Sequence, residues 1–291
     1  MKTIIAATDF SDEARYAADR AAIVAKEQHA HLSLLHVVSS SALNDVRKLF
    51  QAPTDVEAKL IDDAGCMLNE IAAGISLKTG VMASTDVKIG QALADILSAT
   101  ESVDLLVLGA HGGNSLHDLI LGTTAERLLR TCKRPMLVVK RPPKTRYERV
   151  LVPIDFSLYS ASALTMASRI APNARMTILH VFNLPFEGRL RIAGASEDDI
   201  RRYREEEQRA AERKIWELIR ESHVDADRVS SAVEGGGPSP VIVAKAEGLS
   251  SDLIVIGKHG QSWIEDLFLG STTRHVLASS ECDVLVVQKQ A

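Results

Sequence analysis

The sequence has few cysteines, few aromatic residues and no long apolar run, and each shortage excludes a class of protein. Cys66, Cys132 and Cys282 are scattered and form no Cys-x-x-Cys pair, so neither a disulfide framework nor a thiolate metal site is expected. Aromatic residues make up 4% of the chain, which argues against a base-stacking surface. No apolar stretch approaches the roughly 20 residues that span a bilayer. The N-terminus reaches Asp9 and Asp12 before a signal-peptide core could form, so we expect a cytoplasmic protein.

Charge and length give two further expectations. The 291 residues include 34 basic and 38 acidic side chains, for a net charge of −4. That balance provides no electrostatic footprint for nucleic acid or an anionic membrane, and neither is expected as a partner. The length is about twice that of a typical domain, which indicates two domains of similar size.

The chain is an internal duplication. Residues 2–38 and 148–182 begin with the same pattern, KTIIAATDFS and RVLVPIDFS, which aligns Asp9 with Asp155. The strongest match lies near the end of each half, where 109–140 aligns with 257–288 without a gap and 12 of 32 positions are identical.

The two repeats are joined by a short linker. Residues 141–146 read RPPKTR, and the adjacent prolines oppose both helix and sheet pairing. We therefore place one domain at 1–140, the linker at 141–146 and the second domain at 147–291.

Each half alternates β-branched runs with helical patterns. In the first half the runs fall at 3–8, 31–38, 81–87, 104–109 and 135–140, and the third is the weakest. Four of them are dense in Val, Ile and Leu, as strands buried on both faces are. This alternation predicts an α/β fold with a five-stranded parallel sheet in each half.

A nucleotide-type strand order, 3-2-1-4-5, would set strands 1 and 4 side by side at the switch point, where ligands of open α/β sheets bind. Asp9 follows strand 1 and Gly109 ends strand 4, so both would face that crevice. The same holds for Asp155 and Gly257.

The loop after the fourth strand carries the most specific motif. It reads G-x2-G-x9-G-[ST] in both halves, beginning at Gly109 and Gly257. Glycines let backbone N–H groups approach a ligand, and a helix beginning at Thr123 or Ser271 would direct its orphan N–H donors at a phosphate. The alternative is that the glycines make turns and the hydroxyl residues cap the next helix. Two copies in register favour the anion cradle.

With these motifs the sequence resembles a tandem universal stress protein. The resemblance covers nearly the whole chain twice, from TDFS and IDFS to the final VV strands. It implies a Rossmann-like fold that binds ATP, with or without Mg²⁺. Members of the family commonly dimerise through the last strand of the domain, and the chain is expected to imitate such a dimer or to form a homodimer.

The resemblance also implies roles for residues. Asp9 and Asp155 would hold ribose hydroxyls, Val37 and Val181 would meet adenine through their backbone, and the glycine loops would hold phosphates. An aspartate in this place can instead be a helix N-cap. Ala7 stands where the second half has the more typical Pro153, and His111 and His259 stand where Arg is frequent. The full set of expected binding residues is Ala7, Asp9, Val37, Gly109, His111, Gly112, Gly122, Thr123, Thr124, Pro153, Asp155, Val181, Gly257, His259, Gly260, Gly270, Ser271 and Thr272.

No catalytic motif accompanies these cradles. The sequence has no G-x-S-x-G nucleophile elbow and no Walker lysine after a glycine loop. The nine histidines, among them His36 and its counterpart His180, form no ligand set with a recognised spacing, so no metal is expected. We therefore expect an ATP-binding regulatory module without efficient catalysis. A slow ATPase or a nucleotidyl-transferring enzyme is the alternative.

Two further expectations concern packing. The run 200–221 alternates charge blocks and predicts a long solvated helix, with Arg201/Glu205, Arg202/Glu206 and Arg213/Glu217 spaced for i,i+4 ion pairs and Ile215, Trp216, Leu218 and Ile219 giving apolar contacts. The final strands, 135–140 and 283–288, are apolar sheet edges, through which the two halves are expected to pack together.

Overall fold

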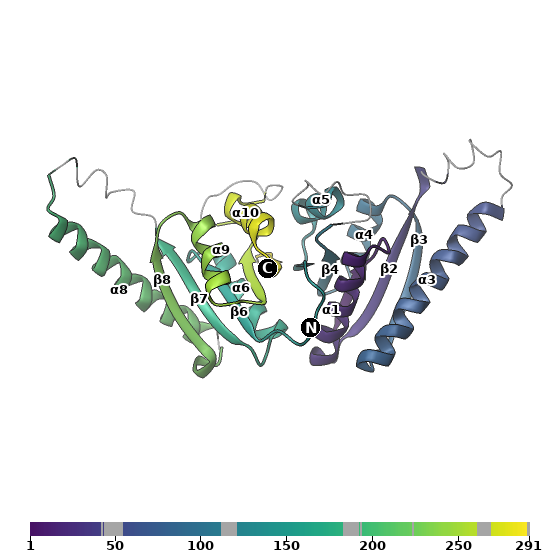
Figure 1. Ribbon diagram of the computed structural model, residues 1–291, viewed down its shortest axis with the longest axis horizontal. Coiled ribbons are helices and arrows are strands. Elements are labelled where there is room, and N and C mark those ends of the chain that lie inside the picture. The colour runs from purple at the N-terminus through teal and green to yellow at the C-terminus, as the bar shows by residue number, and fades with distance from the viewer. Residues whose placement is uncertain are drawn as a thin grey trace. The chain divides into compact units, whose positions relative to one another are not determined.

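A computed structural model describes residues 1–41, 43, 55–111, 121–182, 192, 194–222, 224–260 and 269–289. In the helix at 55–79 the side chains are described from residue 58 onward. The chain divides into two compact units, the first from Met1 to Arg146 and the second beginning at Tyr147. Figure 1 labels the helices and strands of both units. Within the described residues no helix is long and apolar enough to cross a membrane.

The first unit is a parallel sheet with the strand order β3-β2-β1-β4-β5. Strand pairing is parallel throughout, for example Ile4 with Leu105 and Ala7 with Leu35. The expected 3-2-1-4-5 order is therefore confirmed in this half. Its elements are β1 (Thr3–Ala7), α1 (Asp12–Gln28), β2 (His31–Ser39), α3 (Asp55–Thr79), β3 (Ala83–Gly90), α4 (Ala92–Thr100), β4 (Leu105–Gly109), α5 (Thr123–Thr131) and β5 (Met136–Val139).

The second unit repeats this topology with the order β8-β7-β6-β9-β10, again all parallel. Its elements are β6 (Arg149–Ile154), α6 (Leu158–Ile170), β7 (Arg175–Phe182), α8 (Glu197–Glu221), a 3₁₀ turn at Ala226–Arg228, β8 (Val229–Gly235), α9 (Pro238–Gly248), β9 (Leu253–Gly257), α10 (Ser271–Ser279) and β10 (Asp283–Val287).

Burial follows the hydrophobic pattern of the strands. Strands β4 and β5 are buried almost throughout, whereas no residue of β3, at the sheet edge, is buried. That exposure explains why the third run has the weakest strand signal. Helix α1 covers the sheet with alanines, which are buried from Ala14 to Ala25 and allow a close approach to β1 and β4.

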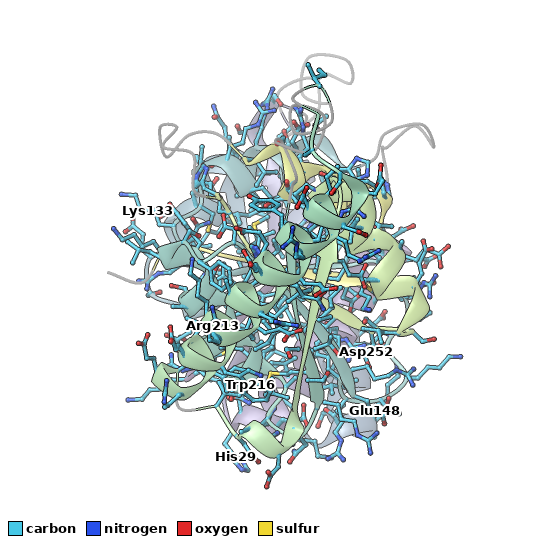
Figure 2. The ribbon with its side chains drawn as sticks, turned by 90° about the vertical axis from the view of Figure 1, so that its left-hand side faces the viewer. His29, Lys133, Glu148, Arg213, Trp216 and Asp252 are labelled. Atoms are coloured by element: carbon cyan, nitrogen blue, oxygen red, sulfur yellow. The ribbon has the colours of Figure 1, made fainter. Side chains whose placement is uncertain are left out.

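One aspartate in each half fastens the start of the first strand to the start of the fourth. Oδ2 of Asp104 accepts hydrogen bonds from the N–H groups of Lys2 (2.5 Å) and Thr3 (3.1 Å). The bond from Lys2, followed by that from Thr3, lowers the pKa of Asp104 against the opposing effect of burial. In the second half Asp252 accepts in the same way from Glu148 (2.8 Å) and Arg149 (3.1 Å), and Figure 2 labels Asp252 and Glu148.

Helix α8 is the long helix expected from the charge blocks. It begins at a capping box in which Ser196 and Asp199 bond reciprocally. The expected pairs of Arg201 and Arg202 with glutamates one turn later do not form, because these arginines reach back to Asp198 and Asp199 in the first turn. Ile215 and Ile219 are buried as expected, whereas Trp216 is 45% exposed beside Arg213 (Figure 2).

Candidate functional site

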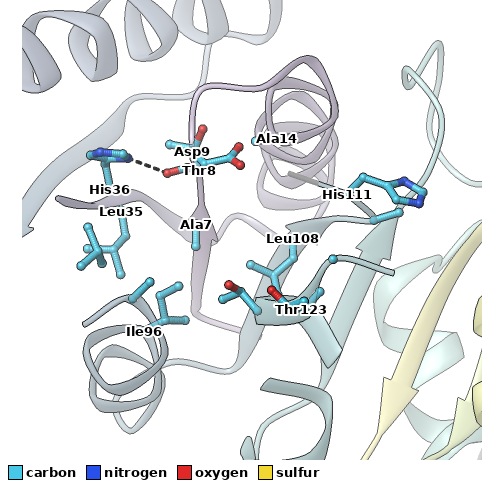
Figure 3. Close-up of a pocket in the computed structure, with 17 residues that line it drawn as sticks. Ala7, Thr8, Asp9, Ala14, Leu35, His36, Ile96, Leu108, His111 and Thr123 are labelled. Atoms are coloured by element: carbon cyan, nitrogen blue, oxygen red, sulfur yellow. Dashed lines mark hydrogen bonds between the residues drawn. The ribbon is translucent and has the colours of Figure 1, made fainter. Parts of the chain in front are cut away.

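The switch point of the first unit holds a pocket of about 360 Å³. It lies where β1 and β4, paired side by side, end and their loops turn to opposite faces of the sheet (Figure 3). Ala92 and Ile96 of α4 add an apolar wall that the motifs did not indicate. All the expected first-half residues that the structure describes line this pocket, namely Ala7, Asp9, Val37, Gly109, His111, Gly122, Thr123 and Thr124, while Gly112 lies outside the described residues.

Asp9 stands before the helix without being its N-cap. The N-cap of α1 is Ser11, whose side chain accepts a hydrogen bond from the Ala14 N–H (3.3 Å). Oδ1 of Asp9 accepts from the Ser11 N–H (3.1 Å) and from the Ser11 hydroxyl (2.6 Å). The N-cap alternative for Asp9 is therefore wrong, and its exposed carboxylate lies at the pocket.

The equivalent aspartate of the second half makes a different set of hydrogen bonds. Oδ1 of Asp155 accepts from the Ser157 N–H (3.0 Å) and from the Ser160 hydroxyl (2.9 Å). The same Ser160 oxygen accepts from the Asp155 N–H (3.0 Å). The first half has Ala14 at this place, and the hydroxyl that donates to Asp9 is that of Ser11 (2.6 Å).

The glycine loop of each half closes on itself. The Gly122 N–H donates to the Ala110 carbonyl, and the Gly270 N–H donates to the Lys258 carbonyl, both at 3.0 Å. The two ends of each loop therefore lie beside each other at the edge of the sheet, and this hydrogen bond fixes where the following helix begins.

The helices after these loops begin without a side-chain cap. Their N-caps are Gly122 and Gly270, and neither α5 nor α10 has a capping hydrogen bond from a side chain. The alternative that the hydroxyl residues cap the helix is thus wrong at these N-caps. The first-turn residues Thr123 and Thr124 line the pocket, so the N-terminus of α5 lies at its wall.

Space requires glycine at two positions of the motif, Gly109 and Gly257. A Cβ on Gly109 would meet the backbone of Glu13 at 2.8 Å, and one on Gly257 would meet Cβ of Tyr159 at 2.6 Å. A Cβ on Gly260 would lie 2.7 Å from Oδ2 of Asp155. None of the three has a positive φ. The structure thus brings the second loop against its aspartate, as the motif predicts.

The remaining second-half residues occupy the equivalent positions. His259 is buried and lies edge-on to Tyr159, with ring centroids 5.5 Å apart. Pro153 has no N–H, and pairing of β6 with β9 ends at Leu151 with Ile254, one pair earlier than between β1 and β4. Val181 lies in β7, and Ser271 and Thr272 begin α10.

Two histidines that the motifs did not select also belong to this region. Nδ1 of His36 donates to the Thr8 carbonyl (2.8 Å; Figure 3). The His36 ring packs on Phe10, with ring centroids 4.3 Å apart. His180 makes the same contacts with the Ile154 carbonyl (3.0 Å) and Phe156 (4.5 Å). Both phenylalanines have left-handed backbones, φ 68° and 63°. The alignment of His36 with His180 was the available signal.

The charge of the pocket is low. Among its described lining residues the titratable side chains are Asp9, His36 and His111, with no lysine or arginine. A phosphate here would be held by backbone N–H groups, hydroxyls and the positive end of α5. No cluster of metal-binding side chains occurs among the described residues.

Comparison with known proteins identifies the family. The model of the universal stress protein family matches residues 1–140 and 146–288. The chain belongs to the universal stress protein family. A universal stress protein of Methanocaldococcus jannaschii is 30% identical over 145 residues, covering 49% of this chain and 84% of that protein. Another from Mycolicibacterium smegmatis is 26% identical over 215 residues, covering 72% of this chain and 70% of that protein.

The fold of this tandem universal stress protein is also found in a crystal structure. A universal stress protein from Archaeoglobus fulgidus superposes with a TM-score of 0.72, at 21% identity, over 99% of this chain and 98% of that chain. The match extends over both halves, so the tandem α/β architecture is shared.

Proposed function

We propose that this universal stress protein binds ATP at its switch-point cradles and that occupancy regulates its association with partners in a stress response. One observation carries the proposal. In the first half an aspartate and an uncapped helix N-terminus line the same pocket. A carboxylate accepts hydrogen bonds from ribose hydroxyls, and free backbone donors bind phosphate, so the pair suits a nucleotide.

The base end of the pocket suits adenine. Val37, Leu35 and Ile96 line it, giving an apolar slot with backbone groups at its edge. Adenine presents a ring-nitrogen acceptor beside an amino donor, which a backbone N–H and C=O complement. ATP fits these groups without a covalent step, and we propose a binding role in place of catalysis.

The first experiment identifies the ligand. Small molecules released from the purified protein by denaturation would be analysed by mass spectrometry and absorbance, followed by calorimetric titration with ATP and GTP. Asp9→Asn combined with Asp155→Asn should weaken ATP binding, because both carboxylate acceptors lose their charge. Asp12→Asn is the matched control, since Asp12 is exposed in the first turn of α1 and does not line the pocket. Absence of ATP binding by the wild type would refute the proposal.

A further inference from the structure

The residue that follows the fourth strand of each half differs in chemistry between the halves. In the first half it is Ala110, which is 2% exposed and lines the pocket. In the second half it is Lys258, which is 4% exposed. Both belong to the glycine motif, directly after Gly109 and Gly257. A lysine therefore replaces an alanine at one of two equivalent buried positions.

The backbone holds these two residues in the same way. The Ala110 N–H donates to the Val139 carbonyl and the Lys258 N–H donates to the Val287 carbonyl, both at 2.9 Å. The Ala110 and Lys258 carbonyls accept from the N–H groups of the glycines that begin the next helices, both at 3.0 Å. The N-terminus of α10 therefore lies beside Lys258, as that of α5 lies beside Ala110.

The direction of the lysine side chain follows from its neighbour in the strand. A Cβ on Gly257 would face Tyr159 of α6, just as one on Gly109 would face α1. Side chains of successive strand residues leave on opposite faces of the sheet. The Lys258 side chain therefore leaves on the face away from α6, which corresponds to the face on which Ala110 lines the first pocket.

A second alanine of the first pocket is also replaced by a polar residue. Ala125 lines that pocket, and its counterpart Thr273 is buried in the first turn of α10. The Thr273 hydroxyl donates to the Gly257 carbonyl at 2.8 Å. This hydrogen bond ties the start of α10 to the end of β9, next to Lys258.

Packing alone does not call for a lysine at this position, because an alanine fills it in the first half. A buried ammonium group costs free energy unless partners compensate its charge. Its three N–H donors can bond a phosphate oxygen while another donor keeps a partner within the protein. Beside the positive end of α10, such a group suits a polyanion.

We propose that Lys258 is a phosphate-binding residue of the second half, and that this half selects its ligand by phosphate charge. The first half, with Ala110 in this place, binds phosphate through its backbone donors and hydroxyls alone. The inference rests on the proposed function and names a residue that recognises the triphosphate. Loss of one charge-assisted hydrogen bond to phosphate lowers affinity by about tenfold to a hundredfold.

The test compares ATP with adenosine, which lacks phosphate. Calorimetric titrations would use the Gly122→Val background, in which the first cradle is blocked. Lys258→Met keeps an unbranched side chain in the buried position, and it should weaken ATP binding by about tenfold to a hundredfold and leave adenosine binding unchanged. Lys289→Met is the matched control, because Lys289 is exposed after β10 in the same half. Circular dichroism checks that each variant keeps the fold.

Unchanged ATP affinity in Lys258→Met, or an equal loss for ATP and adenosine, would overturn the inference while leaving the proposed function intact. NMR of the lysine side chains gives a second readout that needs no nucleotide. The Lys258 signal, assigned by its absence from Lys258→Met, should shift when ATP or tripolyphosphate is added. A shift with tripolyphosphate in a protein that binds no ATP would support the phosphate site and refute the nucleotide proposal. A signal that neither compound moves at saturating concentration would overturn the inference.

Discussion

Gly109 lies directly against the backbone of Glu13, so that a Cβ on this glycine would come within 2.8 Å of the glutamate carbonyl carbon. The contact joins the end of β4 to the first turn of α1, and neither backbone can yield without moving the pocket wall. Gly109→Ala should therefore destabilise the first half by about 1–3 kcal/mol, as overpacking does. Urea denaturation measures the change.

The control for this variant lies in the same half. Gly74 is inside α3, and a Cβ there would meet nothing within 4 Å. Gly74→Ala should stabilise the protein by roughly 0.5–1 kcal/mol, because alanine is the better helix former. A Gly109→Ala variant as stable as the wild type would contradict the close packing.

The hydrogen bonds that Asp104 accepts from Lys2 and Thr3 predict that the stability of the protein depends on pH. The hydrogen bond from Lys2 is the largest of the effects that lower the pKa of Asp104 in the folded protein. The carboxylate therefore stabilises the fold above the unfolded-state pKa of about 3.8, and this stabilisation is lost as the pH falls through the folded-state pKa. Asp104→Asn should cost about 1 kcal/mol at neutral pH, reduced by solvent screening. The difference in unfolding free energy between variant and wild type, measured by urea denaturation, should vanish at low pH. A difference that stays constant down to pH 2 would show that the charge of the Asp104 carboxylate is not its cause.

Replacing His36 should loosen the loop that carries Asp9. His36→Leu removes the donor to the Thr8 carbonyl and the ring contact with Phe10. Because this contact holds a left-handed Phe10, we expect roughly a fivefold loss of ATP affinity at the first site. His36→Asn retains a donor at the position of Nδ1 and should restore most of the affinity. The same affinity in the leucine and asparagine variants would exclude the role of the donor, and His180→Leu is the control in the other half.

Catalysis is tested by turnover. If the cradles only bind, ATP with Mg²⁺ should be hydrolysed far below the typical enzymatic range of about 1–1000 per second. The combined variant Gly122→Val and Gly270→Val places β-branched side chains where the N-cap backbones are extended, so it blocks the cradle without positive-φ strain. Fast ADP release that this variant abolishes would support the enzyme alternative.

Packing between the halves remains a prediction from the sequence. Val138→Glu with Val286→Glu should increase the radius of gyration in small-angle scattering or cause aggregation, if the final strands associate. A profile identical to that of the wild type would place the interface elsewhere.

The positions of the strands could be predicted because strands that are buried on both faces are rich in Val, Ile and Leu. The strand order followed from the nucleotide-type topology that such a series of strands and helices favours. Strand β3, none of whose residues is buried, gave the weakest signal for the corresponding reason. The duplicated motifs also placed Asp9 and the glycine loop at one pocket, since parallel strands end at the same edge.

The finer features depend on contacts that no short pattern encodes. The contact of Ser160 with Asp155 is a hydrogen bond from the first turn of α6 to the residue that follows β6, and a serine at the same spacing on another helix would not make it. The pairing of the first strand with the second ends at Ala7 in one half and one position further, at Ile154, in the other, although the strands have similar sequences. His36 was visible as a repeated residue, but its partner is a backbone carbonyl, which carries no sequence signature.

The duplication has a consequence for how the two sites diverge. In an assembly of two identical subunits every substitution alters both sites, whereas here Ala14 and Ser160 change independently within one gene product. A substitution at either position therefore alters the surroundings of one aspartate, Asp9 or Asp155, and leaves those of the other unchanged.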